Sequence, residues 1–233
     1  MLEDLITELR KLATAEKAKA SAWFFKTGPG QYGEGDQFIG VTVPEQRKIA
    51  KQFKDLPLLE VENLLRSPIH EERLVALVIL VSQFQKADPK TQKEIYNFYL
   101  ANTNYVNNWD LVDSSAGYIV GTYLLDKPRD ILYELAKSNN LWERRIAMVA
   151  TFAFITNGDP KDALKVAKIL LNDRHDLIQK AVGWMLREVG KRCGESHLTH
   201  FLDQHAAAMP RTALRYAIEH FPPEERQKYL KMK

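Results

Sequence analysis

Two tryptophans and one aspartate are the residues of this chain whose types and spacing best suit chemistry. Trp109 and Asp113 lie four residues apart in Asn-Asn-Trp-Asp-Leu-Val-Asp, and Trp184 lies in Val-Gly-Trp-Met-Leu-Arg-Glu. Because residues four apart share one face of a helix, Trp109 and Asp113 would point the same way, as an aromatic plate beside a carboxylate. Both groups attract positive charge, so the pair predicts a site for a cation.

The elements that must position these residues are helices, because the apolar residues follow a helical period almost throughout. A first helix is expected over residues 1–12. Comparable stripes predict helices near residues 57–65, 73–84, 93–100, 115–125, 129–136, 145–155, 163–171, 177–189 and 212–218. Proline residues and a Gly-Asp-Pro run lie between these stripes, and no segment has the pattern of a strand. The sequence therefore predicts an all-α fold.

Several of these helices align as one repeated unit. The aligned positions are Arg73, Asp113, Arg145, Lys180 and Arg211, at steps of 40, 32, 35 and 31 residues. Such steps approximate HEAT-type helix pairs of about 40 residues, although each is short for that class. Stacked helix pairs curve, so we expect a single HEAT-like repeat domain over residues 1–233, a C-shaped solenoid with a basic concave groove.

Charge is spread unevenly along the chain. Residues 1–136 hold 16 Lys and Arg against 19 Asp and Glu, whereas residues 137–233 hold 17 against 11. A basic second half suggests that a polyanion binds mainly there, and a solvated basic surface is the alternative.

Among the aligned positions of the repeat, Asp113 stands where the other units carry Lys or Arg. A carboxylate there weakens DNA binding unless it has another task; the alternative is a structural salt bridge with Arg145.

Composition narrows the setting. Cys193 is the one cysteine, which excludes an internal disulfide framework and favours a reducing, cytoplasmic location. No apolar run approaches about 18 residues, and the start lacks the layout of a signal peptide, so no membrane segment is expected. Cys193, His197, His200 and His205 do not match the spacings of structural zinc sites, so we expect no metal and no other cofactor.

Four segments of the chain resemble those of the AlkD-type DNA alkylation repair glycosylases. They run from Trp109 to Asp113, from Trp142 to Arg145, from Gln179 to Glu188 and, near the N-terminus, from Phe24 to Val41. The similarity extends from about residue 20 to 220, and the order and spacing of the segments make it specific. It implies a hydrolase that removes N3- or N7-alkylated purines from double-stranded DNA, and we expect a monomer.

The resemblance also implies roles for particular residues. The expected catalytic residues are Asp113 as the carboxylate, Trp109 and Trp184 as the active-site aromatics, and Arg145 as the basic partner beside them. The expected DNA-binding residues are Arg187, Lys180, Phe24, Thr42 and Arg47. Relatives often carry Tyr at the position of Phe24, where this chain has no hydroxyl.

One carboxylate is enough for this chemistry. Glycoside hydrolases usually need a second, acidic carboxyl to protonate the leaving oxygen, whereas an N3- or N7-alkylpurine already carries positive charge and leaves without that help. Asp113 would stabilise the oxocarbenium-like sugar and orient a water. Asp110 is no obvious second member, because it sits about 60° round the helix from Asp113. Many glycosylases flip the target base out of the helix, but the resemblance implies recognition without flipping.

Two interpretations remain open at this point. The first is the glycosylase, which needs Asp113, Trp109, Trp184 and Arg145 together. The second is a non-catalytic helical-repeat module that binds damaged or branched DNA or a protein partner. Trp142, flanked by apolar residues at a helix start, is expected in the core rather than in a site.

Overall fold

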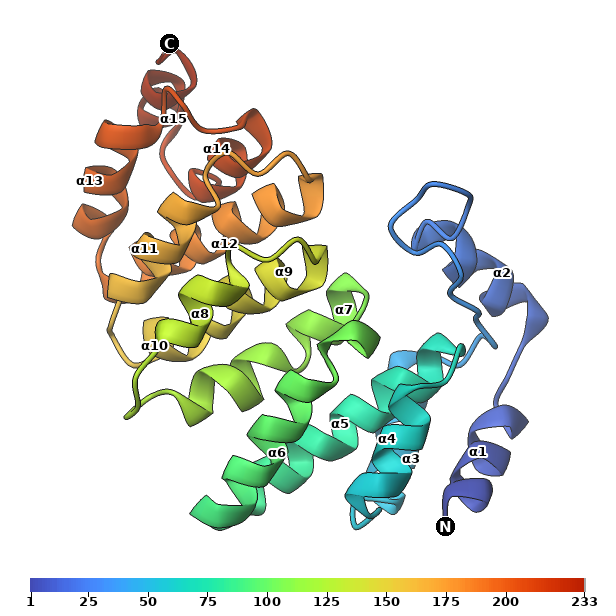
Figure 1. Ribbon diagram of the computed structural model, residues 1–233. Helices are drawn as coiled ribbons and strands as arrows, with labels where there is room; N and C mark the ends of the chain where they lie inside the picture. Colours follow the sequence, from blue (N-terminus) through green and yellow to red (C-terminus); the bar gives the residue numbers. More distant parts are fainter. Residues whose placement is uncertain (233) are drawn as a thin grey trace. The chain divides into compact units, whose positions relative to one another are not determined.

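A computed structural model describes residues 1–232, and these residues form helices joined by loops (Figure 1). The described part of the chain contains no strand, only an isolated bridge between Gln37 and Ile69. The expected all-α class is therefore confirmed. The chain divides into two compact units, the first ending at Ser115 and the second beginning at Ala116; the single domain, the C shape and the basic groove stay predictions.

The first unit is built around the long helix α5. Its elements are α1 (Leu2–Lys11), α2 (Ala15–Phe24), α3 (Val43–Gln52), α4 (Leu58–Leu65), α5 (His70–Lys86), α6 (Pro89–Ala101), a 3-10 turn (Thr103–Tyr105) and α7 (Trp109–Asp113). Helices α3, α4, α6 and α7 all pack against α5. Because α5 is surrounded in this way, it buries nearly all of its first eleven residues, charged ones included.

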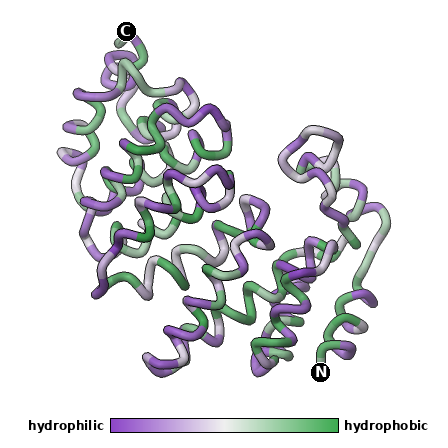
Figure 2. The backbone as a smooth tube through the Cα atoms, viewed as in Figure 1, coloured by the Kyte–Doolittle hydropathy of each residue, from purple (hydrophilic) through white to green (hydrophobic). Residues whose placement is uncertain are grey.

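The second unit is built around α12. Its elements are a π-helix (Gly117–Gly121), α8 (Asp130–Leu135), α9 (Leu141–Ala150), α10 (Phe152–Thr156), α11 (Lys161–Ile169), α12 (Asp176–Cys193), α13 (Glu195–His205), α14 (Arg211–Ala217) and α15 (Pro223–Leu230). Helices α9, α10, α11, α13 and α14 pack against α12. Hydrophobic and hydrophilic residues occur within single helices (Figure 2), as expected where each helix buries one face.

Consecutive helices pack as pairs, as a helical repeat requires. Helix α4 contacts α5, α8 contacts α9, and α11 contacts α12. Arg73, Arg145 and Lys180 each lie in the first turns of the second helix of a pair, as the repeat register predicts. Asp113 differs, because it is the last residue of α7 rather than an early residue of a longer helix.

The break after Asp113 has a local cause. The Ser115 hydroxyl donates to the carbonyl oxygen of Leu111 at 2.6 Å and is hydrogen-bonded to the Tyr99 hydroxyl at 2.9 Å. Side-chain hydroxyls that bind backbone carbonyls compete with regular helical bonding. The stripe at residues 115–125 therefore forms an irregular continuation with a π-helical turn at Gly117–Gly121.

Two glycines allow helices of the second unit to approach closely. A Cβ atom at Gly121 would meet the carbonyl oxygen of Ala150 at 2.1 Å, and one at Gly183 would meet that of Ala213 at 2.4 Å. These contacts are shorter than real Cβ atoms make, so the helix crossings depend on the missing side chains.

Gly121→Ala should destabilise the protein by about 1–3 kcal/mol, because a methyl group forced against backbone overpacks the crossing. Gly117, four residues earlier in the same π-helix, is the matched control, since its Cβ would find only ordinary contacts of 3.6 Å or more. Gly117→Ala should be neutral or stabilise by up to about 1 kcal/mol. Urea unfolding of both variants measures the difference, and equal midpoints would contradict the close crossing.

Candidate functional site

Helix α7 carries two of the expected catalytic residues. Trp109 is its first residue and Asp113 its last, and both side chains are partly exposed. The preceding Asn108 begins the helix, with its side-chain oxygen accepting from the Trp109 amide at 2.9 Å. The expected placement of both residues on one helix is thus confirmed.

The Trp109 ring belongs to an aromatic cluster. It stacks on Phe25 with ring centroids 5.3 Å apart and an angle of 16° between the planes. Phe24, an expected DNA-binding residue, lies edge-on to Trp109 at 6.0 Å and is 56% exposed. One face of Trp109 is therefore covered by Phe25, and an exposed aromatic ring lies next to it.

A buried charged cluster lies behind α7, and its centre is His70, the first residue of α5. His70 Nδ1 lies 3.0 Å from Asp36 Oδ2, and His70 Nε2 lies 2.8 Å from Asp110 Oδ2. Asp36 also accepts from Arg73 Nη2 at 2.5 Å and from Asn108 Nδ2 at 2.9 Å. Asp110 is thus paired with an imidazole, which agrees with its exclusion as a second catalytic carboxylate.

The sequence reasoning missed His70 and Asp36. The available signal was His-Glu-Glu-Arg at residues 70–73, a charged run directly before a strongly apolar helical stripe. Charged residues at core-facing helical positions need buried partners. That need would have indicated a buried ionic cluster, although not which residues complete it.

The cluster shifts two pKa values. Burial by itself lowers the pKa of His70, but hydrogen bonds to Asp110 and Asp36 outweigh it and raise the pKa above its ordinary value. Burial by itself raises the pKa of Asp36, but the hydrogen bond to His70 and the charge of Arg73 outweigh it and lower the pKa. Both shifts favour the ionised forms, an imidazolium paired with carboxylates.

In the second unit, α12 carries Trp184 and α9 carries Arg145. Trp184 is partly buried, with its ring 6.2 Å from that of Phe152. The Arg145 side chain is 5% exposed, and its Nη1 donates to the carbonyl oxygen of Leu177 at 2.5 Å. Arg145 therefore links α9 to the start of α12, the helix that holds Trp184.

The two basic side chains that are expected to bind phosphate already lie next to acidic residues. Lys180 Nζ lies 2.6 Å from Asp176 Oδ2, one turn earlier on α12. Arg187 forms an ion pair with Glu219. Exposed ion pairs are weak, so a DNA phosphate can compete with these carboxylates for both cations.

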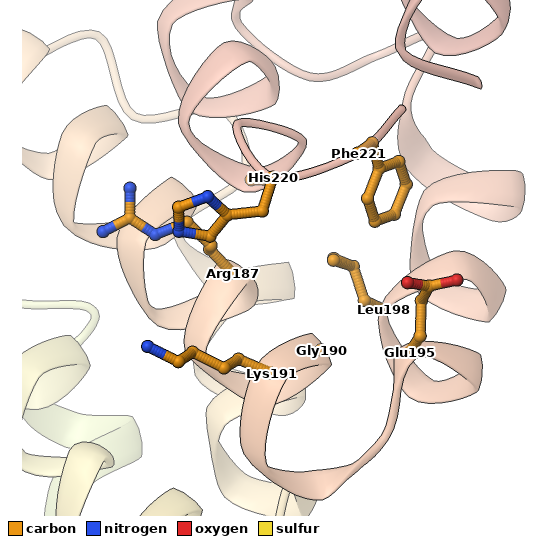
Figure 3. A pocket seen from close by; sticks show the side chains of 8 residues that line it. Arg187, Gly190, Lys191, Glu195, Leu198, His220 and Phe221 are labelled. Atoms are coloured by element: carbon orange, nitrogen blue, oxygen red, sulfur yellow. The ribbon is translucent and has the colours of Figure 1, made fainter. Parts of the chain in front are cut away.

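A cavity of about 370 Å³ opens beside Arg187. Figure 3 shows Arg187, Lys191 and His220 toward one side of it, and Phe221, Leu198 and Glu195 toward the other. The Arg187 Nε atom is buried and has no hydrogen-bond partner among the described residues. The cationic side of this cavity thus includes one of the expected DNA-binding residues.

The other expected residues lie on or beside α3 and in the core. Thr42 precedes α3 and forms a capping box with Glu45, whose side chain accepts from the Thr42 amide at 2.9 Å and from its hydroxyl at 2.6 Å. Arg47 is exposed on α3. Trp142 is 8% exposed, which confirms its expected place in the core.

Residues 1–232 offer neither a metal site nor a membrane-spanning helix. No group of three or more His, Cys, Asp or Glu there could hold a metal ion. No helix in that range is long and apolar enough to span a membrane.

The expected site residues fall into two groups, one in each unit. The structure brings Trp109, Asp113 and Phe24 together in the first unit. Trp184, Arg145, Lys180 and Arg187 belong to the second unit. The assembly of both groups into one site is therefore part of the proposal below.

Comparisons with known proteins bear on the family and the fold. Residues 5–221 match a family model described as DNA alkylation repair enzyme. A solved structure, a predicted DNA alkylation repair enzyme from Enterococcus faecalis, is similar with a TM-score of 0.72 and 18% sequence identity, covering 91% of this chain and 97% of that one. At that identity the likeness shows the fold alone, and no curated protein sequence matches. Since the family match spans nearly the whole chain, the protein belongs to the DNA alkylation repair enzyme family.

Proposed function

We propose that this protein is a DNA glycosylase that begins base excision repair. It hydrolyses the N-glycosidic bond of cationic N3- or N7-alkylated purines, such as 3-methyladenine and 7-methylguanine, in duplex DNA. The observation that carries the proposal is the pairing of Trp109 with Asp113 on one short helix, with one face of the indole backed by Phe25. This arrangement offers a ring face and a carboxylate to the same positive charge.

The electrostatics of the reaction suit a single carboxylate. The alkylated base leaves as a neutral molecule, and the positive charge passes to the sugar as the bond breaks. Asp113 stabilises that oxocarbenium-like sugar and orients the water that attacks it. Asp110 is unsuited to share this work, because His70 holds it at 2.8 Å in a buried pair.

The second unit contributes the remaining groups. It carries 19 Lys and Arg against 14 Asp and Glu, so its charge favours a polyanion. Trp184 supplies a second ring, and Arg145, fixed through Leu177, supplies the basic partner of the reacting centre. Lys180 and Arg187 bind backbone phosphates and so fix the register of the duplex without reading its sequence.

The direct test is release of free 7-methylguanine from methylated duplex DNA, with Asp113→Asn as the matched variant. The change keeps the volume of the side chain and removes its charge. Because Asp113 acts on charge that develops as the bond breaks, the single-turnover rate should fall by about 100-fold or more. Affinity for undamaged duplex should stay level or rise, since a negative group has left a DNA-binding surface.

Two results would count against this assignment. A folded Asp113→Asn variant that cleaves at the wild-type rate would make Asp113 a structural residue. A wild-type protein that binds duplex DNA but releases no base would make the non-catalytic binding module the better account.

Arg187→Ala and Lys180→Ala should each weaken binding to all duplexes to a similar degree, whether or not they carry a lesion. Each lost phosphate contact should lower the slope of log affinity against log salt by about 0.9. Glu219→Gln is the control for Arg187, because it removes the partner carboxylate and keeps the arginine side chain. Binding by this variant should be equal or stronger. An unchanged salt slope in both alanine variants would show that neither side chain contacts DNA.

A further inference from the structure

We propose that His70, with Asp36 and Asp110, positions Trp109 and Asp113 for the reaction, and that this positioning requires the positive charge of the imidazole. The inference rests on the proposed function, since it concerns the same reacting groups. It goes beyond that function by assigning a role to a buried cluster of charged side chains.

The first observation is that the cluster holds α7 on both sides of Trp109. Before it, Asn108 donates its side-chain amide to Asp36 at 2.9 Å. After it, Asp110 is bound to His70 at 2.8 Å. The side chains of His70 and Asp36 are 2% and 5% exposed, so this anchor lies in the interior. Because α7 has only five residues, it is too short to be stable by itself, and its direction depends on such anchors.

The second observation is that the same imidazole supports the ring on which Trp109 stacks. The His70 ring lies 4.8 Å from that of Phe25 and 4.6 Å from that of Phe38. Phe25 in turn stacks on Trp109 at 5.3 Å. A movement of His70 would therefore reach Trp109 by two routes, through the backbone of α7 and through the aromatic stack.

The third observation is the balance of charge. The charged groups that face His70 are Asp110 from α7, Asp36 from the loop before α3, and Arg73 from α5 itself. Two carboxylates and one guanidinium leave one negative charge to be compensated, and protonated His70 compensates it. The neighbouring Glu71 and Glu72 are engaged elsewhere, by the Gly40 amide at 2.8 Å and by Ser67 at 2.6 Å.

Asp110 depends most on this charge. Its Oδ1 atom is buried and has no hydrogen-bond partner among residues 1–232, so His70 supplies the contact that the structure gives to its side chain. Neutral imidazole keeps only one N–H and cannot donate to both carboxylates. Loss of the proton would therefore leave Asp110 or Asp36 without its donor, and α7 would lose an anchor.

The sign of the pH dependence follows from this requirement. Hydrogen bonds to the two carboxylates raise the pKa of His70 above its ordinary value of 6.5. The anchor is complete below pH 6.5 and is lost as pH rises through the raised pKa of the folded protein. We expect the excision rate to fall on the alkaline side of that pKa.

The experiment compares wild type, His70→Gln and the double variant His70→Gln/Asp110→Asn, in single-turnover excision of 7-methylguanine from pH 6 to pH 10. His70→Gln should lose at least 10-fold in rate with little change in duplex affinity, because Asp110 keeps an uncompensated charge. The double variant replaces the ion pair by a neutral amide pair, so it should recover part of the rate and lose the alkaline fall. Thermal unfolding checks that each variant is folded.

The inference would be overturned by a His70→Gln variant with the wild-type rate and pH profile. It would equally be overturned if the double variant kept the alkaline fall, since His70 would then not be the titrating group.

A second readout separates this inference from the proposed function. The indole N–H signal of Trp109 in nitrogen-15 NMR spectra, assigned with Trp109→Phe, should shift with the same midpoint as the His70 imidazole, and the shift should vanish in the double variant. The signal of Trp142, in the core of the second unit, is the control. If wild type excises no base but the Trp109 signal titrates, the glycosylase proposal fails and the coupling stands. If the signal does not titrate, the coupling fails whatever the activity.

Discussion

The interaction on which the first unit depends is the pairing of buried charges at the start of α5. An ion moved into a protein interior costs several kcal/mol unless it gains close partners. Four consecutive residues, His70 to Arg73, meet this demand, and each binds a different partner. His70 binds Asp110, Glu71 binds the amides of residues 39–41, Glu72 binds Arg10, and Arg73 binds Asp36. These bonds tie α1, the loop before α3, and α7 to one helix end.

This arrangement explains how a five-residue helix can hold the proposed catalytic groups. A site requires rigid support for the side chains that meet the substrate. In α7, support comes from the ionic cluster behind the helix and from Phe25 beside Trp109. In the second unit, support comes instead from close packing, with Gly183 allowing α14 to approach α12, the helix that carries Trp184. The two units thus fix their site residues by different physical means.

The sequence predicted most of the helices that bury an apolar stripe, and it predicted them for that reason, but it did not indicate α3 or α13, which also bury apolar residues. Helices α5, α11 and α12 follow their stripes to within a few residues, whereas the stripe at 145–155 covers the end of α9 and most of α10. The helix α2 was not indicated, because it has no buried residue and so carries no periodic signal. The break after Asp113 was also missed, since it arises from hydroxyl bonds of Ser115 that periodicity cannot register. For the site, the spacing between individual residues was more informative than the apolar periodicity, because a separation of four residues placed Trp109 and Asp113 on one helix.

What the sequence could not predict in the site is the cluster behind it. His70, Asp36 and Asp110 are distant in the chain and meet only after α5, α7 and the loop before α3 have packed. Long-range ionic partners leave no local pattern, whereas the catalytic candidates fall in short segments with fixed spacing. The hydrogen bond from Arg145 to Leu177 could not be predicted either, because it depends on the packing of α9 on α12.

The most direct test of the central claim, that Asp113 stabilises positive charge on the sugar, is a comparison of two abasic-site analogues in duplex DNA. One carries a cationic pyrrolidine ring in place of the sugar, and the other a neutral tetrahydrofuran ring of the same size. Wild-type protein should bind the cationic analogue at least 10-fold more tightly, since it resembles the transition state. Asp113→Asn should lose most of this preference, with a smaller remainder from the ring face of Trp109. Equal binding of both analogues by wild type would contradict the account.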